Sequence, residues 1–157
     1  CFDDTGVDAL RAMLNVPVIG ICQAAMLSAS MVATGFSVVT TLPRSVPVIE
    51  ELALRYGMER RCRRVRAADI PVLALEVDGS DAREKIRAEV ERAVAEDRCE
   101  AVILGCAGMT DLPVWLTQET GVPVIDGVVA GVKMMEALIG AGITTSKVGA
   151  YATPRKK

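Results

Sequence analysis

The sequence contains no histidine, and this absence narrows the chemistry that the chain can perform. Without histidine there is no Ser–His or Cys–His dyad, no imidazole general base, and none of the common zinc sites that use histidine ligands. Acid–base chemistry in this chain therefore has to fall to Cys, Asp, Glu, Lys or Tyr.

Paired cysteine motifs are also missing. The five cysteines are odd in number, widely spaced and never arranged as CxxC: Cys1, Cys22, Cys62, Cys99 and Cys106. This pattern argues against a disulfide framework and against a zinc site, so we expect no metal. It favours a reducing compartment, and we expect a cytoplasmic location.

Long hydrophobic runs and an excess of basic charge are absent as well. No apolar stretch reaches the roughly 18 residues of a membrane span, and no signal peptide is visible in a chain that starts at Cys1. The formal net charge is -2 with both signs interspersed, so neither a membrane nor a nucleic acid is an expected partner. The basic run 60–64 is an exception, which we interpret as a solvated turn or a subunit contact rather than a phosphate site.

Half of the chain (51%) is hydrophobic, enough to bury a core, and short apolar runs alternate with helical patterns. We expect strands at 16–21, 36–41, 101–105 and 122–125, and helices at 23–34, 45–56, 81–96, 110–120 and 128–139. Residues 72–75 fit either a short strand or a packed loop. The alternation predicts parallel βαβ units and therefore an α/β fold.

Several polar residues follow the expected strands. Because functional groups of parallel sheets gather at the carboxyl ends of the strands, these positions are candidates for a site: Cys1, Thr40, Thr41, Cys106 and Asp126. The two threonines fit hydrogen bonding to a substrate as well as they fit strand propensity and helix capping.

Two of the cysteines have similar local settings. Cys1 opens the run CFDDTG, and Cys106 ends AVILGC and precedes AGMTD. A helix start after each would favour thiolate, and its backbone N–H groups suit a carboxylate or enolate oxygen. The alternatives are a buried structural cysteine at 106 and a helix cap at Asp3 or Asp4. We interpret Cys22 as a core residue.

Four segments together resemble the hydantoin/allantoin racemases of the aspartate/glutamate racemase superfamily. They are CFDDTG at 1–6, PVIGICQAA at 17–25, FSVVTTL at 36–42 and VILGCAGM at 102–109. The similarity continues through PVIDG at 123–127 and TTSK at 144–147.

The resemblance implies a two-lobed α/β fold with a parallel sheet in each lobe and a cleft between them. Residues 1–22 with 126–157 would form part of the first lobe, and 23–125 the second lobe. Nothing corresponds to the family's N-terminal strand and loop, and Cys1 looks like the end of a strand. We therefore expect the first lobe to be incomplete and the chain to match the C-terminal two-thirds of the enzyme.

The implied reaction is racemisation at C5 of 5-substituted hydantoins, allantoin among them, without a cofactor. One cysteine as thiolate would take the C5 proton and the other as thiol would return a proton to the opposite face, with Cys1 and Cys106 as the catalytic pair. The implied partner is a small-molecule substrate, and a homo-oligomer is expected. The implied substrate-binding residues are Phe2, Asp3, Thr40, Thr41, Ala107, Gly108 and Met109.

The motifs depart from those of aspartate and glutamate racemases. Those enzymes have a Cys-Asn-Thr type first motif and a polar residue after the second cysteine, where this chain has Phe2-Asp3 and Ala107-Gly108. A less polar pocket suits a hydantoin ring better than a doubly charged amino acid. The alternatives are an amino-acid racemase, a superfamily lyase such as an arylmalonate-type decarboxylase, and an inactive fragment or binding module.

Overall fold

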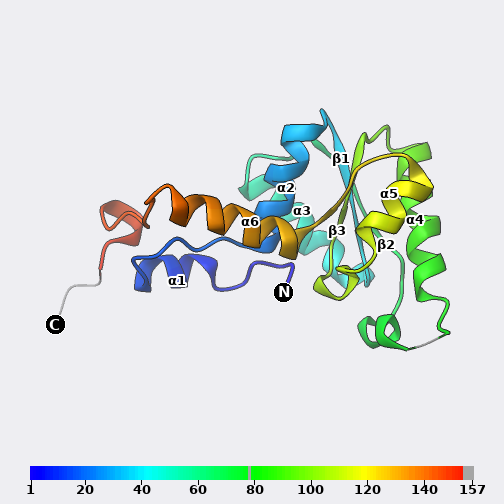
Figure 1. Ribbon diagram of the computed structural model, residues 1–157, viewed down its shortest axis with the longest axis horizontal. Coiled ribbons are helices and arrows are strands. Elements are labelled where there is room, and N and C mark those ends of the chain that lie inside the picture. The colour runs from blue at the N-terminus through cyan, green and yellow to red at the C-terminus, as the bar shows by residue number, and fades with distance from the viewer. Residues whose placement is uncertain (78, 154–157) are drawn as a thin grey trace.

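The centre of the molecule is a four-stranded parallel sheet (Figure 1). The computed structural model describes residues 1–77 and 79–153; within these ranges the strands are ordered β2-β1-β3-β4. Their bounds are β1 Phe36–Thr40, β2 Cys62–Ala67, β3 Ala101–Leu104 and β4 Val124–Asp126. The prediction of an α/β fold with parallel strands is confirmed.

Six helices accompany the sheet in the described residues: α1 Val7–Met13, α2 Ile21–Val32, α3 Val46–Arg55, α4 Ala82–Glu96, α5 Pro113–Thr120 and α6 Gly127–Gly140. Short 3-10 turns join them, namely η1 Pro43–Ser45, η2 Val72–Glu76, η3 Ala107–Met109 and η4 Gly149–Tyr151. The sequence did not predict α1, whereas it predicted the other five helices to within a few residues.

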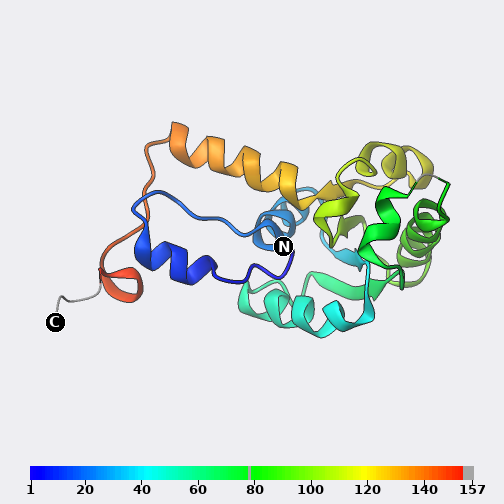
Figure 2. The same cartoon turned by 90° about the horizontal axis from the view of Figure 1, so that it is seen from below.

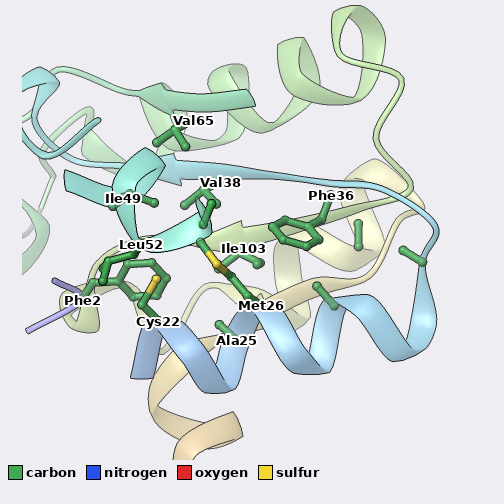
Figure 3. Packing of buried hydrophobic residues seen from close by; sticks show 14 residues of the cluster. Phe2, Cys22, Ala25, Met26, Phe36, Val38, Ile49, Leu52, Val65 and Ile103 are labelled. Carbon is green, nitrogen blue, oxygen red and sulfur yellow. The ribbon is translucent and has the colours of Figure 1, made fainter. Parts of the chain in front are cut away.

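Side chains alternate between the two faces of the sheet, as the period of two in a strand requires. Phe36, Val38 and Ile103 belong to a core cluster that includes residues of α2 and α3 (Figure 3). Val39 and Leu104 point to a second cluster beneath α4 and α5. The sheet is therefore the middle layer of an α/β/α sandwich, with both faces buried.

The expected strand at 16–21 is not formed. Residues 16–20 have no regular secondary structure, and Ile21 begins α2. The segment has the apolar, β-branched composition of a strand, but no described strand lies beside it. Its carbonyls instead accept hydrogen bonds from side chains, with Arg11 bonded to Val18 and Thr145 bonded to Val16.

The basic run 60–64 enters a strand rather than staying in a turn. β2 starts at Cys62 and pairs along β1 as an edge strand, with Arg63 and Arg64 exposed and Val65 and Arg66 buried. Charged side chains on an edge strand are a common protection against pairing with other chains. Residues 72–75 form part of η2 rather than a strand, which matches the packed-loop alternative.

α1 and the segment after it lie beside the segment that follows α6, at the end of the molecule away from the sheet (Figure 2). Thr145 donates its backbone N–H to Asn15, and Lys147 donates to the carbonyls of Arg11 and Ala12. Tyr151 donates its hydroxyl to Asp8. We call this part, residues 1–20 with 128–153, the arm. Residues 154–157 lie outside the described residues.

Candidate active site

A cavity of about 510 Å³ lies at the carboxyl edge of the sheet and is lined by both Cys1 and Cys106. These residues are 105 positions apart in the chain, and the fold brings both of them to the same cavity. Six of the seven residues predicted to bind substrate line the same cavity: Phe2, Asp3, Thr40, Thr41, Ala107 and Gly108.

Backbone pairing positions Cys106. The residue before it, Gly105, donates its N–H to the Val39 carbonyl at 2.8 Å and accepts the Thr40 hydroxyl at 3.0 Å. A Cβ on Gly105 would lie 3.0 Å from the Thr40 Cβ, so a side chain does not fit without movement. The end of β3 therefore places Cys106 at the cavity. Its backbone is extended and its side chain is half-buried.

The short turn after Cys106 presents backbone N–H groups. η3 spans Ala107–Met109, and the Met109 N–H donates to the Cys106 carbonyl at 3.2 Å. None of the hydrogen bonds between described residues is donated by the N–H of Ala107 or Gly108. The first N–H groups of a helical turn have no hydrogen-bond partner within that turn. The N–H groups of Ala107 and Gly108 can therefore donate to an oxygen atom of a bound ligand.

Phe2 anchors the segment that carries Cys1. Its ring is 4% exposed and packs in the core cluster with Cys22 and Leu52 (Figure 3). The ring also fills the space where a side chain of Gly127 would be, with Cε2 3.0 Å from that Cβ position. Cys1 itself is exposed. Its location therefore depends on the packing of the next residue.

Asp4 ties the same segment to the start of α2. Its Oδ1 accepts the backbone N–H of Cys22 at 3.0 Å, and its Oδ2 accepts the N–H of Gln23 at 2.9 Å and the hydroxyl of Tyr56 at 2.8 Å. Asp4 is thus a helix cap, as one of the alternatives predicted, but it caps α2 and not the helix that follows Cys1. Burial, followed by this bond to Asp4, raises the pKa of Tyr56 above its ordinary value.

Three candidate residues have roles that the sequence did not predict. Met109 is fully buried among the residues under α4 and α5 and does not line the cavity, so it is a core residue in this structure. Thr40 lines the cavity, but its single hydroxyl proton is donated to Gly105, so it is not free to donate to a substrate. Asp126 caps α6 by accepting the Val129 N–H at 2.6 Å and lies outside this cavity.

The remaining cysteines lie outside the cavity. Burial raises the pKa of Cys22 and raises that of Cys62 to about 12, and the pKa of Cys99 is also raised by burial. These three side chains therefore stay protonated near neutral pH. The prediction that Cys22 is a core residue is confirmed, since it is 0% exposed.

The rest of the cavity wall comes from residues that the sequence did not single out. These are Leu42 and Ser45, Val48 and Ile49 near the start of α3, Val72 of η2, and Arg44 of η1. Apart from Arg44 and Ser45 they are apolar, and nothing in their local sequence distinguishes them from core residues. Only the fold brings them to the two thiols.

Within residues 1–77 and 79–153, no helix combines the length and the hydrophobicity that a bilayer crossing requires. In the same ranges, no three His, Cys, Asp or Glu side chains lie close enough together to hold a metal ion.

Residues 1–135 match the family model described as Asp/Glu/Hydantoin racemase. The chain belongs to this family. A hydantoin racemase of Rhizobium meliloti is 59% identical over all 157 residues, and one of Pseudomonas sp. (strain NS671) is 46% identical over the same length. The solved structure of an allantoin racemase from Klebsiella pneumoniae matches the whole chain with a TM-score of 0.95 and 52% identity.

The chain is shorter than these relatives. It spans 65% and 63% of the two hydantoin racemases and 64% of the allantoin racemase structure. The racemase fold of the family is shared over the whole length of this chain.

Proposed function

We propose that the protein racemises 5-substituted hydantoins at C5 through an acid–base pair formed by Cys1 and Cys106. The observation that carries this proposal is the placement of both thiols on one cavity in a chain without histidine. The names of the similar proteins, hydantoin racemase and allantoin racemase, support the substrate class.

The chemistry needs two groups that exchange one proton each with the same carbon. The C5–H bond lies next to a ring carbonyl, so its electron pair can move into an enolate when a thiolate removes the proton. The second thiol then gives its proton to the opposite face of C5, and the C–H bond re-forms with inverted configuration. The two cysteines end with exchanged protonation states, and the reverse reaction uses them in exchanged roles. Such a pair titrates as one coupled unit.

The enolate oxygen needs hydrogen-bond donors. The N–H groups of Ala107 and Gly108 stand beside Cys106 on the cavity wall and serve this purpose in the proposal. Gly108 has no side chain to cover them, and a Cβ there would lie 3.1 Å from the Leu75 Cδ1 and 3.8 Å from the Cys106 Sγ. The small residues after Cys106 thus leave room for the flat ring against the backbone.

We infer that residues 23–125 form one lobe and that 1–22 with 126–157 contribute to the other. The hydrogen bonds between residues 11–16 and 145–147 support this division. A cytoplasmic location and a homo-oligomer remain predictions.

The test is a racemisation assay on the complete polypeptide encoded by the gene, with a single enantiomer of a 5-alkylhydantoin or of allantoin. We expect optical activity to decay with the wild type and at least about a hundredfold more slowly with Cys1→Ser and with Cys106→Ser, because each variant lacks one proton carrier. Cys62→Ser is the matched control, since Cys62 lies outside the cavity. Unchanged racemisation in both cavity variants would rule out the two-thiol reaction. Loss of carbon dioxide from an arylmalonate without racemisation would instead support a lyase.

A further inference from the structure

A second hollow of about 500 Å³ adjoins the cavity that holds the two thiols. It is lined by Leu42, Pro43, Arg44, Pro71, Val72 and Leu73. Three of these residues, Leu42, Arg44 and Val72, also line the thiol cavity. The shared residues stand where the two spaces meet, so a group attached to a ring between the thiols can extend past them into the outer hollow.

Arg44 is the only cation among the residues that line either space. Some other exposed arginines are paired, such as Arg55 with Asp8 and Arg83 with Asp111, whereas Arg60, Arg63 and Arg64 are, like Arg44, without an ion pair among the described residues but line neither space. No carboxylate of the described residues lies within ion-pair distance of Arg44, so its guanidinium is available to a ligand. Apart from this side chain the outer hollow is lined by apolar residues and prolines.

The charge on the cavity wall is arranged asymmetrically. Asp3, which lies next to the Cys1 segment, is the anion among the lining residues, and its carboxylate accepts the Thr5 N–H at 3.3 Å. An anionic group on the substrate is repelled from this part of the wall and attracted to Arg44. A guanidinium is well matched to a carboxylate because it can donate two parallel hydrogen bonds.

We propose that Arg44 and the outer hollow form a subsite for the C5 substituent, and that the subsite favours a short alkyl stem ending in a carboxylate. The stem would contact Leu42 and Val72, and the carboxylate would bind the guanidinium. This inference rests on the proposed function and names the substituent class that the same site prefers. Arg44 is a specificity-determining residue in this account and takes no part in proton transfer.

The test compares two hydantoins of nearly equal shape, 5-(2-carboxyethyl)hydantoin and 5-(2-carbamoylethyl)hydantoin, in the complete polypeptide. The readout is the ratio of their kcat/KM values for racemisation, acid over amide. We expect Arg44→Gln to lower this ratio about fivefold, the size expected of a solvent-accessible ion pair. We expect Arg44→Lys, which keeps the charge but loses the bidentate fork, to retain part of the preference. About 0.5 M salt should reduce the wild-type ratio by screening.

Arg60→Gln is the matched control, because Arg60 is exposed and lines neither space. A ratio in Arg44→Gln within twofold of the wild-type ratio would overturn the subsite. A wild type that racemises 5-isobutylhydantoin but neither test compound would also overturn it and would leave the proposed function standing. A wild type that racemises none of the three compounds would contradict the proposed function itself.

Discussion

The sheet region, residues 23–125, and the arm each supply one cysteine to the cavity, and they hold it by different means. β1 and β3 are buried along their whole length, whereas α1 of the arm has no buried residue. Cys106 is located by backbone pairing between β1 and β3, and Cys1 is located by two side chains, Phe2 and Asp4. The position of Cys1 therefore depends on a few contacts whose removal can be tested one at a time.

The largest loss of stability is expected in the sheet region, at a buried ion network. The Arg66 guanidinium is 3% exposed and binds both oxygens of Asp97, at 2.5 and 2.6 Å, and also Glu89 and Glu96. Asp97→Asn leaves part of that buried charge without its partner, so we expect about 3 kcal/mol less stability in urea unfolding at pH 7. Glu96→Gln is the control, because Glu96 is half exposed and binds the same arginine. Equal losses in the two variants would contradict the role of burial.

The same ion network predicts that the stability of the protein depends on pH in the acid range. Burial raises the pKa of Asp97, but the hydrogen bonds from Arg66 and Ser37 outweigh this effect and hold the pKa below its ordinary value. A carboxyl group with a depressed folded pKa contributes its stability above the unfolded pKa and loses it as pH falls through the folded pKa. The difference between wild type and Asp97→Asn should therefore be constant above about pH 5 and shrink below about pH 4. A difference that grows on acidification would contradict this assignment.

The junction between the two regions is tested by Asp4→Ala. This change removes the acceptor of two N–H groups of α2 and of the Tyr56 hydroxyl, so we expect about 2 to 3 kcal/mol less stability in urea unfolding. Asp3→Ala is the matched control, since Asp3 makes one long contact within its own turn and should lose less than about 0.5 kcal/mol. Similar losses in both variants would remove the basis for treating Asp4 as the anchor of the Cys1 segment.

Gly20, which lies beside Asp4, gives a second test of whether Asp4 anchors the Cys1 segment. A Cβ on Gly20 would lie 2.1 Å from the Asp4 Cγ, so Gly20→Ala has to displace the carboxylate. We expect about 2 kcal/mol of destabilisation together with faster alkylation of Cys1 by iodoacetamide. Gly140→Ala at the end of α6 meets no atom within 4 Å and should be neutral or slightly stabilising. If Gly20→Ala behaved like Gly140→Ala, the packing of Asp4 against Gly20 would be wrong.

The smallest effect is expected at the Cys106 side of the cavity. Thr40→Val keeps the shape of the side chain but removes the donor to the Gly105 carbonyl, which should cost about 1 kcal/mol in thermal or urea unfolding. Thr41→Val is the control, because the Thr41 hydroxyl has no hydrogen-bonding partner among the described residues. A larger loss for Thr41→Val than for Thr40→Val would show that Thr40 does not support the Cys106 turn.

Much of the sheet region could be predicted from the sequence because β1, β3 and β4 are largely apolar. β1, β3 and β4 have few exposed positions, which gives the signal of a strand buried on both faces. The sequence did not predict β2, because this edge strand buries only part of its residues and the exposed charges of Arg63 and Arg64 are typical of a turn. The apolar run at 16–21 has the composition of a strand, but composition alone cannot supply the neighbour that a strand must pair with.

The sequence predicted those residues of the candidate site that belong to local motifs. The Cys1 and Cys106 motifs identified the two thiols and most of the small residues beside them. Arg44, Val48 and Val72 carry no such motif, and they join the cavity only through the course of the chain around α3 and η2. Met109 shows the opposite case, since it belongs to the motif yet faces the core.

The most direct test of the two-thiol account is hydrogen exchange at C5 in heavy water, followed separately for each enantiomer of one hydantoin. In the wild-type complete polypeptide both enantiomers should incorporate deuterium. In Cys1→Ser only the enantiomer whose proton faces Cys106 should exchange, and in Cys106→Ser only the opposite enantiomer. If both variants exchanged the same enantiomer, or if both exchanged the two enantiomers at the wild-type rate, Cys1 and Cys106 would not be the two bases.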